Sequence, residues 1–175
     1  VIIIASSISL ILPGGFEKIK RTIQLAISNL AGGLFIGGVA PQVEAIYVND
    51  QLCPDTPTGP QINCIENSYN TITIKATIYD SNGDCDQDTV YAYICPSNIG
   101  TPCNADTTDS THTITMTFQS QSADGLRCNY TGTYDLYFYE RYGDWYINVT
   151  STDPQSLSNS TVKTFYYVEL ASVLY

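Results

Sequence analysis

Charged residues are scarce in this chain, and basic ones are the scarcest. Only 14% of its 175 residues are charged, where a soluble domain typically has about 25%. Seven lysines and arginines stand against seventeen acids, for a formal net charge of −10. Such a chain repels phosphate backbones, which argues against nucleic-acid binding. With 43% hydrophobic residues it is no disordered acidic tail, and one histidine leaves little material for acid–base catalysis.

The few charges are unevenly distributed. Lys18, Lys20 and Arg21 fall within four positions, whereas residues 41–175 contain four basic residues and sixteen acids, a formal charge of −12. Composition therefore predicts two parts, an N-terminal segment of residues 1–40 and an acidic domain of residues 41–175.

Residues 1–12 and 22–40 contain no charged residue. The first run is too short to span a bilayer as a helix, which needs about 20 residues, and the second is near that length. The segment is expected to be helical, with a break at Pro13-Gly14-Gly15 left open. Glycines at positions 33 and 37 have the spacing that lets helices approach closely. The positions expected to carry assembly are Val1, Ile4, Ile8, Leu12, Ile23, Ile27, Gly33 and Gly37.

Eighteen valine, isoleucine, leucine and phenylalanine side chains lie in residues 1–40. At roughly 1.5–3 kcal/mol each for full burial, they must sit in lipid, in a core or against copies of themselves. An apolar segment at the start of a chain without an initiator methionine resembles the processed N-terminus of type IV pilins and archaeal flagellins. The resemblance implies a subunit that is held in the membrane before it polymerises through this helix. The basic cluster so near the start and the Pro13 break depart from the pattern.

Two other interpretations of this segment stay open. In the first, the segment is a plain membrane anchor or an uncleaved signal peptide. In the other, residues 1–12 form a strand, favoured by the β-branched residues at positions 1–4, and fill a groove in a neighbouring subunit.

Apolar and polar residues alternate in short runs through the acidic domain, which predicts a mainly β fold, a seven-stranded sandwich. Residues 73–84 and 143–153 resemble strands of the immunoglobulin-like domains of archaeal surface proteins. Trp145 follows the last cysteine, so an antibody-type Cys…Trp…Cys core is not implied. The expected strands are Val43–Val48, Thr71–Tyr79, Thr89–Cys95, His112–Gln119, Thr131–Tyr139, Trp145–Ser151 and Thr161–Val173.

All six cysteines lie in the acidic domain, with spacings that match neither a zinc ribbon nor a redox pair. Disulfides are favoured, which indicates an oxidising exterior or a hyperthermophile. Fifteen pairings exist, and sequence alone cannot choose among them. Local loop closure suggests Cys53–Cys64 and Cys95–Cys103, leaving Cys85–Cys128. Sequons at Asn129, Asn148 and Asn159 are expected glycosylation sites if the chain is exported.

Oxygen-bearing side chains recur at every second position in the run Asp80–Asp88, as in Ca²⁺ loops. The candidate ligands are Asp80, Asn82, Asp84 and Asp86, and no other cofactor is expected. Cys85 and Tyr91 stand where an EF-hand needs glycine and glutamate, and an Asn-Gly turn explains most of the pattern.

No catalytic set can be recognised around the single histidine, His112, so an enzyme is not expected. The fourteen tyrosines are expected in the core or in subunit contacts, with a carbohydrate-binding face as the other interpretation.

These observations favour a structural subunit of an extracellular, cell-surface filament, a homopolymer similar to archaeal type IV pili and used in adhesion or motility. Its external contacts would be surfaces or glycans. The rival classes are a membrane-tethered immunoglobulin-like binding module and a fibre subunit that exchanges a donor strand.

Overall fold

The computed structural model describes residues 38–57, 59–97, 103 and 112–170. The chain divides into two units, residues 1–37 and 38–175. The expected N-terminal helix and its eight assembly positions fall in the first unit, outside the described residues, and stay predictions. Among the described residues no helix is long and apolar enough to cross a membrane.

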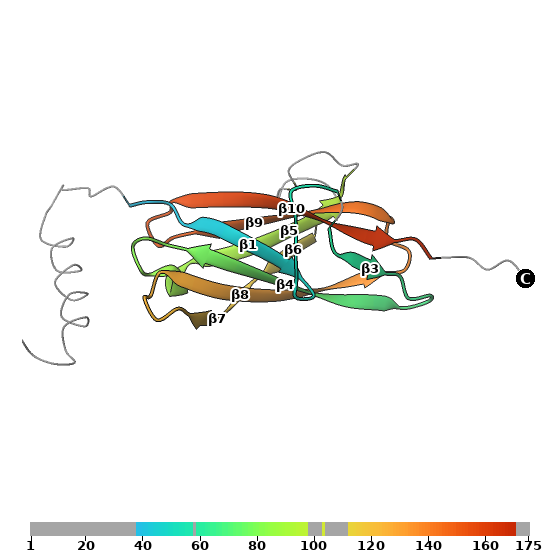
Figure 1. Ribbon diagram of the computed structural model, residues 1–175, viewed down its shortest axis with the longest axis horizontal. Coiled ribbons are helices and arrows are strands. Elements are labelled where there is room, and N and C mark those ends of the chain that lie inside the picture. Colours follow the sequence, from blue (N-terminus) through green and yellow to red (C-terminus); the bar gives the residue numbers. More distant parts are fainter. Residues whose placement is uncertain (1–37, 58, 98–102, 104–111, 171–175) are drawn as a thin grey trace, which may run out of the picture. The chain divides into compact units, whose positions relative to one another are not determined.

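The second unit is mainly β and consists of two five-stranded sheets (Figure 1). One sheet has the order β2-β1-β4-β8-β7 and the other β3-β10-β9-β5-β6. A single 3-10 turn, η1 (Cys85–Gln87), interrupts the described strands. The strands are β1 (Gln42–Val48), β2 (Gln51–Leu52), β3 (Gln61–Asn63), β4 (Tyr69–Tyr79), β5 (Thr89–Pro96), β6 (His112–Thr115), β7 (Thr117–Gln121), β8 (Arg127–Tyr137), β9 (Gly143–Thr152) and β10 (Ser158–Val168).

Alternation in the sequence determines which face of each strand is buried. In β4, Ile72, Ile74, Ala76 and Ile78 are all buried, while the residues between them face outward or lie at the rim. In β1 the alternation slips by one residue after Val43, where the register with β4 shifts at a bulge. The mainly β prediction is therefore confirmed in two sheets whose inner faces share one core.

The core lies between the sheets and includes the largest buried side chains. Trp145, Phe165 and Tyr167 come from neighbouring strands β9 and β10, and the Trp145 and Phe165 rings lie 5.9 Å apart. The indole Nε1 of Trp145 donates a hydrogen bond to the Arg141 carbonyl at 2.7 Å, which satisfies its one polar group. These residues join the inner faces of β1, β4, β5 and β8 in one apolar cluster.

The expected strand His112–Gln119 is wrong as one element, because it divides at Met116 into strands of different sheets. β6 pairs with β5 in one sheet, and β7 pairs with β8 in the other. The amide of Met116 donates to the Val90 carbonyl at 2.9 Å at the crossing point. Both halves keep the same period-two pattern, so the alternation does not reveal the change of sheet.

The structure has two short strands that the sequence does not predict, β2 and β3, and with the division at Met116 these make ten described strands rather than seven. β3 runs parallel to β10, where Ile62 pairs with Tyr167. The chain reaches this position past Gly59, where an added Cβ would lie 2.2 Å from the Thr164 carbonyl oxygen. Glycine is needed there because any side chain would collide with the backbone of β10.

Candidate functional site

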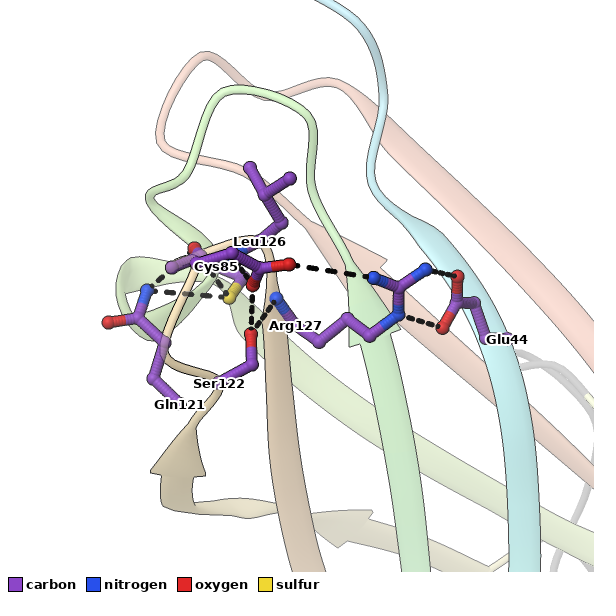
Figure 2. Close-up of polar contacts among 8 residues, drawn as sticks. Glu44, Cys85, Gln121, Ser122, Leu126 and Arg127 are labelled. Carbon is purple, nitrogen blue, oxygen red and sulfur yellow. Dashed lines mark hydrogen bonds and ion pairs between the residues drawn. The ribbon is translucent and has the colours of Figure 1, made fainter.

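The disulfide Cys85–Cys128 ties η1 to the start of β8, with a Cα separation of 5.8 Å. Both cysteines are fully buried. Around the sulfur of Cys85, the Gln121 side-chain amide lies 3.7 Å from Sγ and donates to the Gly125 carbonyl at 2.9 Å (Figure 2). The β4–β5 connection leads from one sheet to the other, and the disulfide fixes it to the β7–β8 hairpin.

A second disulfide, Cys95–Cys103, closes the connection that follows β5. Cys103 is buried, and its carbonyl accepts a hydrogen bond from the Asn148 side-chain amide at 2.9 Å. These two bonds are two of the three expected pairings.

The third expected disulfide, Cys53–Cys64, is wrong, because both residues are free cysteines. The residues next to the two cysteines contact β10 at different positions: the Pro54 carbonyl accepts a hydrogen bond from the Thr164 amide, and Asn63 pairs with Val168. The two cysteines are therefore about four residues apart along β10, roughly 13 Å at 3.3 Å per residue, whereas a disulfide needs Cα atoms within about 7 Å. Burial raises the pKa of Cys53 to about 12, so it is an unreactive core thiol.

Arg127, next to Cys128 at the start of β8, makes its contacts on the outer face of the sheet. It crosses the ring of Tyr79 on β4, with the guanidinium carbon 4.9 Å from the ring centroid, and donates to both carboxylate oxygens of Glu44 on β1 at 2.8 and 2.9 Å. Figure 2 shows this fork together with the turn that Ser122 organises by donating to Asp124. The contacts brace three strands across the sheet, which is a structural role.

The three sequons have different surroundings. Asn129 and Asn159 are exposed on β8 and β10, whereas Asn148 is 3% exposed and faces the Cys103 connection. A glycan on the Asn148 amide has no room in this fold, so that expected site is wrong for the folded domain. Glycosylation at Asn129 and Asn159 stays a prediction.

His112, the only histidine of the chain, lies beside two aromatic rings. Its ring centroid is 4.6 Å from that of Tyr134 and 6.4 Å from that of Trp145, and its Nε2 is 3.8 Å from a Glu140 oxygen. The Tyr134 hydroxyl donates to the same carboxylate at 3.0 Å. These contacts give His112 a packing role where β6 meets β8 and β9.

The tyrosines divide between core and surface. Tyr130 and Tyr167 are buried, whereas five aromatic side chains form an exposed cluster around the β8–β9 connection. Tyr137 contacts Tyr69 and stacks on Tyr139, with centroids 5.4 and 5.3 Å apart, and Tyr139 meets Phe138 edge on. The exposed set is Tyr69, Tyr137, Phe138, Tyr139 and Tyr142.

The predicted calcium loop forms the turn after β4. Asp80 is fully buried, its Oδ1 accepts from the Asn82 amide at 2.7 Å, and its carbonyl accepts from Gly83, whose φ is +77°. Asn82 and Asp86 are exposed, and Asp84 is partly buried. The predicted set Asp80, Asn82, Asp84 and Asp86 is thus not gathered around one point, and the described residues contain no ready-made group of three metal-binding side chains.

Two further aspartates approach this turn from elsewhere in the chain. Asp88, between η1 and β5, is 8% exposed, and Asp153, which follows β9, is 4% exposed. Burial raises the pKa of Asp88 to about 7, against a hydrogen bond from Ser151 that lowers it, and the charges of Asp80, Asp84 and Asp153 raise it further. The pKa of Asp80 is raised for the same first reason, with Asp84 and Asp153 adding to it.

These shifts predict that the protein without divalent cations is more stable in mild acid. Folded Asp88 has a pKa of about 7 against an ordinary value of 3.8, so the native state binds more protons between these values. The stability this proton supplies is fully present near pH 4 and is lost as the pH rises through 7. In EDTA, we expect a higher Tm at pH 5 than at pH 8, measured by circular dichroism.

Asp88→Asn is the matched variant, because an amide keeps the shape without the titration. It should reduce the difference in Tm between pH 5 and pH 8. The other groups facing Asp88, namely Asp80, Asp84, Asp153 and the Tyr130 hydroxyl, remain in this variant. An unchanged pH profile in Asp88→Asn would contradict the assignment to Asp88.

Comparisons with known proteins find little. No family model and no curated protein matches the chain. Among solved structures it is similar to AggA, the major subunit of aggregative adherence fimbriae type I from Escherichia coli, at 12% identity and a TM-score of 0.34, over 76% of this chain and 99% of that one. We draw nothing about function from a similarity this low. What the structure defines is a class of domain, a disulfide-linked sandwich of two β-sheets.

Proposed function

We propose that this protein is a structural subunit of an extracellular filament that polymerises through its N-terminal apolar segment. The observation that carries the proposal is that the described domain fills its core with its own side chains. Trp145, Phe165 and Tyr167 are buried between its own sheets. Val39 lies in the described domain and is 52% exposed, and the other large apolar side chains of residues 1–40 need another place to be hidden from water. Copies of the same segment supply one, after a membrane-held stage.

The strand order supports a surface-exposed module of immunoglobulin type. Assigned in chain order, β1-β4-β8-β7 corresponds to the A-B-E-D order of an immunoglobulin sheet, and β5-β9-β10 to C-F-G. Two buried disulfides favour an oxidising location outside the cell. In a filament of this kind the sandwich would form the outer sheath, and the exposed aromatic cluster around Tyr137 would be available for contact with neighbours, surfaces or glycans.

Donor-strand exchange is less well supported as the mode of assembly. It requires a sandwich with a groove that a neighbour's strand completes. Here β10 pairs with β9 at ten successive positions, from Ser158↔Thr152 to Tyr167↔Gly143, and contributes Phe165 and Tyr167 to the core. The place in the sheet that a donated strand would fill is already occupied by β10 of the same chain.

The test is to look for filaments made by the full chain. Material sheared from the surface of expressing cells should contain filaments by negative-stain microscopy, and peptide mapping should find residues 1–40 in them. Ile27→Asp should abolish the filaments, because it places a charge in the buried segment. The matched control is Leu52→Asp, since Leu52 is 60% exposed on the sandwich.

Two results would overturn the proposal. One is full-length protein with residues 1–40 intact that stays monomeric in detergent and never forms filaments, which would favour the membrane-tethered binding module. The other is filaments that persist in Ile27→Asp, which would place the assembly contacts elsewhere.

A further inference from the structure

Four aspartates from two distant parts of the chain meet at one end of the sandwich. Asp80, Asp84 and Asp88 lie in the β4–β5 connection, and Asp153 lies at the start of the β9–β10 connection. β5 and β9 are antiparallel neighbours with Thr89 opposite Thr152, so Asp88, just before β5, and Asp153, just after β9, lie at the same end of the sheet. Figure 1 shows both connections at the end where β1 begins.

Each of the three buried aspartates uses one carboxylate oxygen and leaves the other without a partner. Asp80 Oδ1 accepts from the Asn82 amide, Asp88 Oδ2 from the Ser151 hydroxyl at 2.9 Å, and Asp153 Oδ1 from the Leu157 amide at 2.7 Å. Within this group of four aspartates, the buried oxygens that have no hydrogen-bond partner are Asp80 Oδ2, Asp84 Oδ1, Asp88 Oδ1 and Asp153 Oδ2.

Burial of these unpartnered, charged oxygens destabilises the folded domain. Asp80, Asp88 and Asp153 are 0, 8 and 4% exposed, and burying a carboxylate without compensation is strongly unfavourable. Among the described residues, no ion pair joins a basic side chain to these aspartates, and Lys75, Arg127 and Lys163 pair with other acids. Unsatisfied buried groups in a native structure require an explanation, and a bound ion is one of the few available.

We propose that this end of the sandwich binds a hard divalent cation, Ca²⁺, through Asp80, Asp84, Asp88 and Asp153. Calcium takes six to eight oxygen ligands at 2.3–2.6 Å in irregular geometry, and carboxylates with free lone pairs are its preferred donors. The described carboxylates are not positioned as a finished chelate, so binding draws the unpartnered oxygens inward by side-chain rotation. Magnesium fits less well, because it requires near-octahedral geometry and keeps several of its waters.

The site differs from the one that the sequence run suggests. Exposed Asn82 and Asp86 are replaced as ligands by Asp88 and Asp153, and the latter comes from the other connection. The chain enters the domain beside this cluster, because a Cβ on Gly38 would lie 3.9 Å from Asp153 Oδ2 and 3.8 Å from Asn82 Nδ2. A bound ion therefore joins the β4–β5 and β9–β10 connections next to residue 38, where the domain begins.

The experiment uses the detergent-solubilised full chain, stripped with EDTA and returned to pH 7.5. Titration with CaCl₂ by calorimetry should give saturable binding with a Kd of roughly 10⁻⁴–10⁻³ M, the range of extracellular calcium modules. A tenfold excess of Ca²⁺ over Kd should raise Tm by roughly 3–6 °C. If neither binding heat nor a Tm shift is observed, the proposal is overturned. The carboxylate charges would then be neutralised by protons that the aspartates share.

Two variants separate ligation from misfolding. Asp80→Asn combined with Asp153→Asn should weaken Ca²⁺ binding at least tenfold and yet raise the Tm in EDTA, because it removes mutual repulsion. Asp86→Asn, on the same connection but exposed, should keep Kd within about twofold. Wild-type affinity in the double variant, or loss of binding in Asp86→Asn alone, would show that the ion binds elsewhere. The outcome is independent of whether the chain forms filaments.

Discussion

Replacing Cys85 and Cys128 together by alanine is expected to lower the free energy of unfolding by about 4 kcal/mol. The bond closes a loop of 43 residues, and the chain-entropy account assigns roughly that stabilisation to a loop of this size. Alanine is the appropriate replacement because both positions are fully buried, and a serine would add an unpaired hydroxyl. Urea denaturation of the full chain in detergent, followed by circular dichroism, measures the loss.

The matched control is the other disulfide. Cys95 and Cys103 are separated by only 8 residues, so the same account gives about 2.5 kcal/mol for the corresponding double alanine variant. Wild-type protein kept reduced should lose both contributions at once. A larger loss from the short loop than from the long one would show that packing around Cys103, rather than loop closure, supplies most of the stabilisation.

Six of the seven expected strands have counterparts that share most of their residues, because alternation survives wherever one face of a strand is buried. In β4 the buried Ile72, Ile74 and Ile78 mark that face in the sequence itself. The division at Met116 is invisible for the same reason, since an inward residue stays inward when the chain crosses to the other sheet. β3 has only three residues and pairs in parallel, which is too short for any periodic signal.

The cysteines show where local reasoning succeeds and where it fails. Cys95 and Cys103 do close a short loop, and Cys85–Cys128 joins the remaining connection to β8. Loop closure fails for Cys53 and Cys64 because Pro54 and Asn63 contact β10 at positions four residues apart, which holds the two cysteines away from each other. These contacts join residues more than 100 positions apart, so the spacing of the cysteines in the sequence cannot predict them.

The acidic cluster shows the same limit. The recurring acids from Asp80 to Asp88 are plain in the sequence, and their Asn-Gly turn is present. What sequence spacing cannot supply is Asp153, which reaches the cluster only because β5 and β9 are neighbours. It also cannot distinguish exposed Asp86 from buried Asp88, two positions away, since η1 rotates them to different sides.

Trp145→Ala is the single substitution expected to cost most in the described core, about 3–5 kcal/mol. The side chain is fully buried against Phe165, and its removal leaves a large cavity in the core between the two sheets. It also leaves the Arg141 carbonyl without the donor that the indole supplies at 2.7 Å. The measurement is urea denaturation followed by circular dichroism, because this variant lacks the only tryptophan of the chain and gives no indole fluorescence.

Two further variants, Tyr139→Ala and Trp145→Phe, serve as controls for the loss of stability in Trp145→Ala. Tyr139 is an aromatic residue 69% exposed, and its loss should change stability by less than about 0.5 kcal/mol. Trp145→Phe keeps most of the apolar volume but not the donor, so its cost should lie between those of the two alanine variants. If it equalled that of Trp145→Ala, the Arg141 hydrogen bond rather than the packing would be the main contribution of this residue. A small loss in Trp145→Ala itself would mean that the sheets close over the cavity, and that the core of this sandwich is not organised around the indole.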